Sequence, residues 1–191
     1  MATIRKGSQS VLLVVDVQVG VMQQAWEAER VIKNVTAAVE KARSAHVPVI
    51  WVRHSDEELL HGSPDWQLMP ELKPAADEPV IDKNFNSSFE ETTLEKELTR
   101  LGATHIVLAG AATNWCIRAT AYAALDRGYD LTLIKDAHTT ASIEDDGVIL
   151  VAAKDIVREL NVAMAWLSYP GRANNTVAAA EVATAFQMPV Q

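Results

Sequence analysis

Residues 105–116, His-Ile-Val-Leu-Ala-Gly-Ala-Ala-Thr-Asn-Trp-Cys, decide the fold of this 191-residue chain. The apolar, β-branched start of the stretch predicts a buried strand over residues 105–109. The chain then turns, and Thr113 or Asn114 stands where a cap is needed for a helix over residues 115–127. A buried strand that feeds a helix through a short turn is the building unit of parallel α/β sheets.

Strands and helices alternate on both sides of this stretch. Upstream, we expect strands over residues 11–15, 49–52 and 80–82, a helix over 26–45, and a second helix that begins at a capping box of Ser88 and Glu91. Downstream, we expect a strand over 131–134, a helix from about 145 to 160, and a sixth strand over 162–167. Such alternation implies parallel strands joined by right-handed crossovers. The sequence therefore predicts a three-layer α/β/α sandwich with a mostly parallel six-stranded sheet.

The chain length fits one domain with a full hydrophobic core. No internal repeat or domain boundary is visible, so we predict a single domain over residues 1–191. Residues 171–191 carry a helical Ala/Val stretch without a clear core-facing side, and we expect them to form a C-terminal arm. Residues 54–79 are polar and rich in proline, which predicts a long loop of the kind that is often functional.

The composition excludes several classes of function. The formal net charge is -8 and no Lys/Arg run occurs, which argues against nucleic-acid binding. No apolar stretch approaches the roughly 18 residues that cross a bilayer. The first ten residues lack the apolar stretch of a signal peptide, so we expect a cytoplasmic protein without membrane contacts. The single cysteine cannot form an intrachain disulfide.

That cysteine, Cys116, is the first candidate for chemistry. It falls in the first turn of the expected helix, where exposed amides and the helix macrodipole favour a thiolate and lower the thiol pKa. The same amides can stabilise an oxyanion on an attacked carbonyl. The alternative is a small buried apolar residue, because free cysteines are often buried.

Asp16 and Lys83 are the next candidates, because each follows the end of an expected strand. Ligands of open α/β sheets bind beyond the carboxyl ends of the strands, so we expect both residues to lie near Cys116 at one edge of the sheet. The alternatives are a turn-forming role for Asp16 and a solvated surface charge for Lys83.

Four segments together resemble one protein family. They are Val-Val-Asp-Val-Gln at 14–18, Lys83 followed further on by Ser-Phe at 88–89, Gly-Ala-Ala-Thr-Asn-Trp-Cys-Ile at 110–117, and Asp-Ala-His-Thr-Thr at 136–140. In this order they resemble the isochorismatase-like cysteine hydrolases, a group that includes nicotinamidases, carbamoylsarcosine and ureide amidases, and streptothricin hydrolases. The resemblance implies a hydrolase that cleaves a C–N bond of a small amide, ureide or lactam through a thioester.

The resemblance also implies a role for each site residue. Asp16 is the general base, Lys83 its cationic partner and Cys116 the nucleophile. The bond between Ala111 and Ala112 is cis, and the Ala112 and Cys116 N–H groups form the oxyanion hole. The reaction needs no cofactor, and the partners are a small-molecule substrate and further copies of the chain in a homodimer or homotetramer.

Several side chains near the expected strand ends are candidates for substrate binding. Aromatic rings would wall the pocket and polar groups would orient the substrate, although a core or surface role is open for each. These candidates are Gln18, Trp26, His54, Asn84, Phe85 and Trp115.

Metal binding is a separate question. His54, Asp56 and His61 carry ligand atoms suited to a divalent ion. Their order differs from that of the metal site in the nicotinamidases that this family contains, so we predict no metal.

Three other functions remain as alternatives. An isochorismatase-type hydrolase would act on a vinyl ether, and an inactive relative of the same fold would serve as a binding or assembly module. Nucleotide binding is disfavoured because the turn over residues 16–24 contains only Gly20 and lacks a glycine-rich phosphate cradle. An inert Cys116 in a stoichiometric iodoacetamide titration would favour the inactive module.

Overall fold

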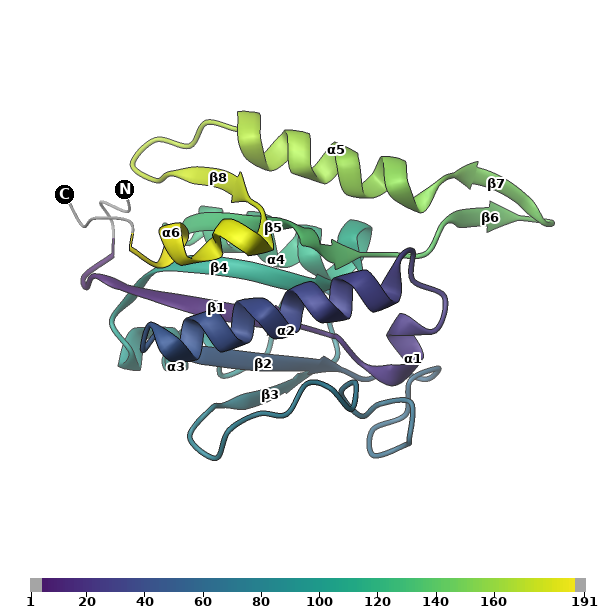
Figure 1. The fold of residues 1–191 in the computed structure, drawn as a ribbon, viewed down its shortest axis with the longest axis horizontal. Coiled ribbons are helices and arrows are strands. Elements are labelled where there is room, and N and C mark those ends of the chain that lie inside the picture. Colours follow the sequence, from purple (N-terminus) through teal and green to yellow (C-terminus); the bar gives the residue numbers. More distant parts are fainter. Residues whose placement is uncertain (1–4, 188–191) are drawn as a thin grey trace.

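A six-stranded parallel sheet forms the centre of the protein. The computed structural model describes residues 5–187 and places the strands in the order β3-β2-β1-β4-β5-β8 (Figure 1). All neighbouring strands in this sheet run parallel. The strands are β1 (Gln9–Val15), β2 (Val49–His54), β3 (Val80–Lys83), β4 (Ala103–Ala111), β5 (Asp130–Thr139) and β8 (Asn174–Val177). The predicted parallel sheet is confirmed.

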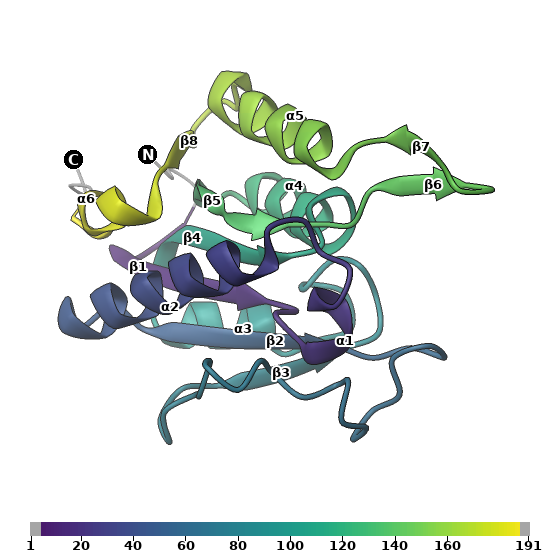
Figure 2. The ribbon, with the colours of Figure 1, turned by 45° about the vertical axis from the view of Figure 1, so that its right-hand side comes forward.

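Helices cover both faces of the sheet, so the predicted three-layer sandwich is also confirmed (Figure 2). One face is covered by α2 (Ala28–Ser44), the short turn η2 (Ala179–Glu181) and α6 (Val182–Phe186). The other face is covered by α3 (Leu94–Arg100), α4 (Arg118–Asp126) and α5 (Ala153–Trp166). A single turn, α1 (Val19–Met22), follows β1. Within residues 5–187, no helix has the length and apolar character to cross a membrane.

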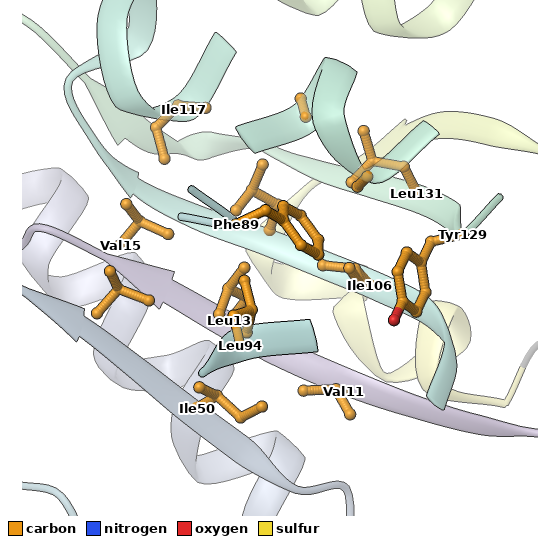
Figure 3. Close-up of a cluster of buried hydrophobic side chains, with 14 of the residues drawn as sticks. Val11, Leu13, Val15, Ile50, Phe89, Leu94, Ile106, Ile117, Tyr129 and Leu131 are labelled. Carbon is orange, nitrogen blue, oxygen red and sulfur yellow. The ribbon is translucent and has the colours of Figure 1, made fainter. Parts of the chain in front are cut away.

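The central strand β1 is buried on both sides, which explains the apolar run over its residues 11–15. Because side chains alternate along a strand, Leu12 and Val14 join the cluster under α2. Val11, Leu13 and Val15 join the opposite cluster, which Figure 3 shows with Phe89, Leu94 and Tyr129. Fully burying a residue such as Leu13 contributes about 1.5–3 kcal/mol, so this strand anchors both layers.

The expected helix over 145–160 is wrong at its start, where the chain forms a hairpin instead. Strands β6 (Ile143–Asp145) and β7 (Val148–Val151) pair antiparallel, and α5 begins only at Ala153. The two residues between the strands, Asp146 and Gly147, have φ of 46° and 77°. Positive φ at both positions is typical of the tight turns that suit hairpins, and Asp-Gly is a preferred sequence for them.

The expected strand over 162–167 is also wrong, because α5 continues to Trp166. The sixth strand is β8, which pairs with β5 in the register Leu131↔Asn174. Residues 171–187, which we expected to form part of a C-terminal arm, therefore supply an edge strand and a helix that packs against α2. The remainder of the expected arm, residues 188–191, lies outside the described residues.

The expected capping box does not form. The Ser88 hydroxyl is buried and hydrogen-bonds the Thr120 hydroxyl at 2.9 Å, which ties the loop after β3 to α4. Glu91 has a left-handed φ of 50°, and α3 begins later, at Leu94. The Ser-x-x-Glu spacing thus occurs in a loop that side-chain contacts hold in place.

Candidate active site

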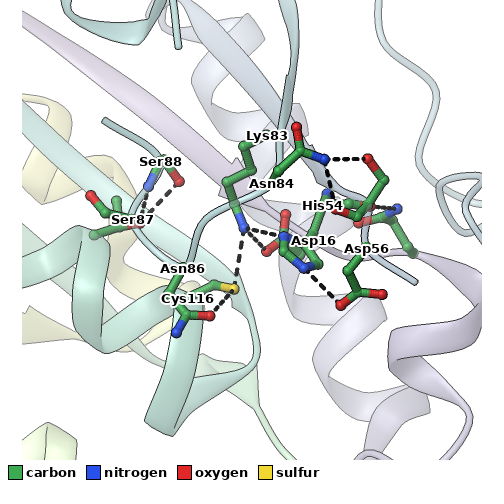
Figure 4. Close-up of polar contacts among 12 residues, drawn as sticks. Asp16, His54, Asp56, Lys83, Asn84, Asn86, Ser87, Ser88 and Cys116 are labelled. Atoms are coloured by element: carbon green, nitrogen blue, oxygen red, sulfur yellow. Dashed lines mark hydrogen bonds and ion pairs between the residues drawn. The ribbon is translucent and has the colours of Figure 1, made fainter. Parts of the chain in front are cut away.

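Three strand ends bring the predicted catalytic residues together. Asp16 directly follows β1, Lys83 is the last residue of β3, and Cys116 lies in the π-helical turn η1 (Thr113–Ile117) after β4. Figure 4 shows the three side chains pointing toward one another.

A glycine allows β1 and β4 to approach closely at this edge. Gly110 lies opposite Val15 in the register and has a φ of 128°. A Cβ atom at Gly110 would lie 1.9 Å from the Val15 carbonyl oxygen, a distance that no side chain can adopt. Glycine at this position therefore lets the turn that carries Cys116 sit beside Asp16.

The Lys83 ammonium group stands at the centre of the site. Its Nζ lies 2.7 Å from Asp16 Oδ2, 3.2 Å from Cys116 Sγ and 3.3 Å from His54 Nδ1. An ammonium has three N–H donors, so these three contacts use all of them. The Lys83 and Asp16 side chains are 0% and 1% exposed. A buried cation therefore links the carboxylate, the sulfur and the imidazole.

Asp16 keeps one acceptor free for chemistry. Its Oδ1 is buried and has no hydrogen-bond partner among residues 5–187. Burial raises the pKa of the carboxyl group above its ordinary value, and the nearby Lys83 charge works in the opposite direction. A carboxylate with a raised pKa and a free lone pair is well suited to accept a proton.

Cys116 is a neutral thiol in the resting site. The residue is 7% exposed, and burial together with the Asp16 charge raises the pKa of the thiol to about 12. This differs from our expectation that a helix end would lower the thiol pKa. Burial is the largest cause of the raised pKa of the thiol and the nearby Asp16 carboxylate is the next, and both oppose the thiolate that we expected at the start of this helix. The thiol therefore needs a base to become a nucleophile.

Asn86 is a site residue that our sequence analysis missed. The Cys116 thiol lies within hydrogen-bonding range of the Asn86 amide, with a Sγ to Oδ1 distance of 3.8 Å. Asn86 follows Lys83 by three residues in the same polar loop after β3. The sequence signal that could have identified Asn86 is its place in a polar segment just beyond the end of a strand that carries a site residue.

His54 extends the network to a second carboxylate. Because the Lys83 ammonium can only donate, His54 Nδ1 accepts, and the ring proton therefore sits on Nε2. That nitrogen lies 3.0 Å from Asp56 Oδ2. The backbone N–H group of Leu59 lowers the pKa of Asp56, which keeps this carboxyl ionised. Asp56 thereby fixes the orientation of the imidazole beside Lys83.

The structure does not bring together the side chains of His54, Asp56 and His61, which we considered as metal ligands. The His61 Nε2 atom lies 3.6 Å from Asp82 Oδ2, and its ring packs on the Trp66 ring with the centroids 4.2 Å apart. Among the described residues, the ligand atoms that do converge are those of Asp16, His54 and Cys116, all within 4.8 Å of one another. The Lys83 ammonium contacts all three groups, so the site carries its own cation between the ligand atoms.

The turn before Cys116 has the predicted cis peptide between Ala111 and Ala112. A buried histidine holds the start of this turn: His138 Nδ1 lies 2.9 Å from the Thr113 hydroxyl, and its Nε2 lies 3.0 Å from Asn161 Oδ1. Burial lowers the pKa of His138 to about 4, so the ring is neutral at pH 7. Its proton therefore lies on Nε2 and the Thr113 hydroxyl donates to Nδ1.

Gln18 has a structural role in place of the substrate contact that we expected. Its side chain is 0% exposed, and its Nε2 donates to the backbone carbonyls of His54 and Trp66 at 2.9 and 2.8 Å. Its Oε1 accepts the His54 backbone N–H at 2.7 Å. Both ends of the amide are therefore occupied, and Gln18 joins β2 to the long loop.

The other substrate candidates lie at different places. His54 contacts the Lys83 ammonium in the candidate active site, whereas Trp26 lines a groove between α2 and α5. Asn84 donates to the carbonyl and hydroxyl oxygens of Ser55, and its side chain thus braces the loop after β2. Phe85 and Trp115 are 39% and 57% exposed, so both rings are open to a ligand at the rim.

Comparisons with known proteins identify relatives over most of the chain. The isochorismatase domain model matches residues 10–160. A streptothricin hydrolase of Streptomyces noursei is 34% identical over 140 residues, which cover 69% of this chain and 55% of that protein. Nicotinamidase 3 of Arabidopsis thaliana is 27% identical over 150 residues, which cover 70% of this chain and 74% of that protein. The chain thus spans about half the length of the streptothricin hydrolases that it matches.

The same architecture occurs in solved structures. A cysteine hydrolase from Pseudomonas syringae pv. phaseolicola superimposes with a TM-score of 0.83, covering 98% of this chain and 99% of that one. The two sequences are 22% identical, so this likeness establishes the fold.

Proposed function

Because the chain belongs to the isochorismatase family of hydrolases, we propose that it is a cysteine hydrolase that cleaves a C–N bond in a small amide, ureide or lactam. The family that the sequence motifs predict is confirmed, and the substrate class is our inference. The observation that carries the proposal is the buried contact of one ammonium, that of Lys83, with both the Asp16 carboxylate and the Cys116 sulfur.

The first half of the proposed reaction forms a thioester. Asp16 accepts the thiol proton while the Cys116 sulfur attacks the substrate carbonyl carbon. The Lys83 ammonium stays beside both groups and balances the negative charge as it moves between them. We assign the Ala112 and Cys116 N–H groups to the developing oxyanion. The C–N bond then breaks, and Asp16 returns its proton to the leaving amine.

The second half releases the acid. A water molecule enters in place of the amine, and Asp16 takes its proton as the oxygen attacks the thioester carbonyl carbon. The C–S bond breaks, the carboxylic acid leaves, and the proton returns to the Cys116 sulfur. The free Oδ1 of Asp16 provides the acceptor for both proton transfers.

The choice of a C–N bond rests on the relatives and on the nucleophile. The relatives include proteins named streptothricin hydrolase, nicotinamidase and maleamate amidohydrolase. A cysteine nucleophile with a single carboxylate base suits acyl transfer, in which the same acid and base serve both halves of the reaction. We propose that no cofactor takes part, because Lys83 supplies the positive charge in the site.

Mass-spectrometric detection of the hydrolysis products from a panel of amides, ureides and lactams, with a vinyl ether as a comparison, tests the proposed function. We expect turnover by the wild-type chain and none by Cys116→Ala, whereas Thr99→Ala, which removes an exposed hydroxyl on α3, should match the wild type. Circular dichroism establishes that each variant is folded. Comparable turnover by folded Cys116→Ala, or turnover of the vinyl ether alone, would refute the proposal.

The thioester can be observed directly, because the chain has a single thiol. Rapid acid quench during turnover, followed by intact-mass analysis, should reveal an adduct with the mass of the substrate acyl group. The adduct should map to Cys116 and disappear with hydroxylamine. A chain that turns over substrate without this adduct would argue against covalent catalysis.

A further inference from the structure

His54 and Lys83 are neighbours in the sheet itself. The register of β2 and β3 pairs His54 with Lys83 at the ends of the two strands. Paired side chains of adjacent strands project from the same face of a sheet, so the imidazole stands beside the ammonium group. The preceding pair, Arg53 and Asp82, projects from the opposite face and forms an ion pair there. Strand register therefore sets the contact between the imidazole and the ammonium.

A turn after β2 holds the imidazole in one orientation. Asp56 Oδ1 accepts the backbone N–H groups of Glu58 and Leu59 at 2.9 and 2.7 Å. The second oxygen of this carboxylate, Oδ2, lies 3.0 Å from His54 Nε2, and Figure 4 shows the ring between the carboxylate and the ammonium group. Gln18 holds the backbone N–H and carbonyl groups of His54 as well. Both the ring and the backbone of His54 are therefore fixed.

The proposed mechanism gives this imidazole no task, although it stands beside the reacting groups. A ring nitrogen of His54 lies within 4.8 Å of both an Asp16 carboxylate oxygen and Cys116 Sγ. Nδ1 accepts from Lys83 and Nε2 donates to Asp56, so neither nitrogen is free to take the thiol proton. The neutral ring instead completes the hydrogen bonding of a buried ammonium without cancelling its charge, which a second carboxylate in its place would do.

We propose that His54 is a positioning residue, which holds the Lys83 ammonium against the Cys116 sulfur so that the thiolate is stabilised as it forms. The inference rests on the proposed function, and it assigns to His54 a role other than the substrate contact that we expected from the sequence. Lys83 Nζ lies closer to Asp16 Oδ2 than to the sulfur, at 2.7 Å against 3.2 Å. The third hydrogen bond, to His54 Nδ1, fixes the direction of all three N–H groups and keeps one of them on the sulfur.

The reactivity of the single thiol tests this role without any substrate. The rate of iodoacetamide alkylation at pH 9, followed by intact mass, reports how well the site stabilises the Cys116 thiolate. We expect folded His54→Leu to react at least about tenfold more slowly than the wild type, because the ammonium is then free to turn toward Asp16. His54→Asn keeps an acceptor close to the position of Nδ1, so its rate should stay within about threefold of the wild type.

Two further variants separate positioning from a general effect on the loop. Asp56→Ala leaves the imidazole in place but frees its orientation, so the alkylation rate should fall between those of the wild type and His54→Leu. His61→Leu removes a histidine of the same loop whose side chain is 64% exposed, and it should react like the wild type. Circular dichroism and urea unfolding establish that each variant is folded before its rate is compared.

Turnover gives a second readout. With a substrate that the wild type hydrolyses, His54→Leu should lower kcat at least about tenfold and leave KM unchanged, because the contact acts as the thiolate forms. A raised KM at unchanged kcat would identify a substrate ligand and overturn the proposal. Equal alkylation rates of folded His54→Leu and the wild type overturn it too, as does His54→Asn reacting as slowly as His54→Leu. If the wild type hydrolyses no compound of the panel, the proposed function fails, whereas the alkylation rates still decide the role of His54.

Discussion

Replacing Lys83 with methionine should destabilise the protein through the carboxylate that it leaves behind. Methionine fills most of the same volume, so the main change is the loss of the ammonium 2.7 Å from Asp16 Oδ2. Both side chains are almost fully buried, at 0% and 1% exposure. Removing one partner of a buried pair typically costs about 3–5 kcal/mol, because an uncompensated charge remains in a low-dielectric site. We expect Lys83→Met to lose this amount of unfolding free energy at pH 8.

The loss should depend on pH with a definite sign. Burial already raises the pKa of Asp16, and without Lys83 that pKa rises further. A protonated Asp16 needs no cation, so the deficit of the variant relative to the wild type should shrink toward acid. It should grow as the pH rises through the raised pKa of the folded state, where the folded protein is forced to ionise the carboxyl group.

Urea unfolding at pH 5 and pH 8 measures this effect for the wild type, Lys83→Met, Asp16→Asn and the double variant. The losses of unfolding free energy in the two single variants, added together, should exceed the loss in the double variant by about 2 kcal/mol or more. The reason is that the double variant buries neither charge of the pair. Lys96→Met, at an exposed lysine of α3, serves as the control. Additive losses, or a deficit equal at both pH values, would show that the pair is not coupled as we infer.

Three further results are expected. Iodoacetamide should modify folded Cys116 slowly but to completion at pH 7, and faster as the pH rises, because the thiol pKa is about 12. Intact mass follows the rate, the urea-unfolded chain should react rapidly, and a folded thiol that never reacts would favour the inactive module. The free energy of unfolding should fall by roughly 3 kcal/mol from pH 7 to about pH 4 because of His138. The pKa of His138 is about 4 in the folded chain, whereas an unfolded histidine takes up its proton near pH 6.5. In urea unfolding, His138→Asn should reduce this dependence of stability on pH. Gln18→Ala should lower the free energy of unfolding by about 1–3 kcal/mol in the same assay, because it leaves buried backbone groups unpaired. Gln23→Ala, at an exposed residue, should change the free energy of unfolding little. Equal effects of the two substitutions would contradict the bridging role of Gln18.

The sequence predicts the centre of this fold well because the central strands are buried on both faces. β1, β2 and β4 each contain a continuous apolar run, over residues 11–15, 49–52 and 106–109, and such runs have few other stable arrangements. The carboxyl ends of β1, β3 and β4 then lie at one edge of the sheet, which is why the sequence predicts that Asp16, Lys83 and Cys116 lie together.

The outer part of the fold is less predictable, because its residues are only half buried. The edge strand β8 reads Asn-Asn-Thr-Val and has no apolar run to reveal it. The exposed apolar residues of β7 imitate the buried face of a helix, although Asp146-Gly147 is a recognisable hairpin turn. Asn86 and the bridging role of Gln18 depend on how two loops fold over the strand ends, and local sequence patterns carry no such information.

The single thiol also determines how the site responds to oxidants. If peroxide converts Cys116 to a sulfenic acid, no second cysteine in these 191 residues can condense with it and protect it as a disulfide. Repair then depends on a small external thiol that can reach a residue only 7% exposed. Burial therefore slows both the initial damage and its reversal, and oxidised chains should recover activity gradually under reducing conditions.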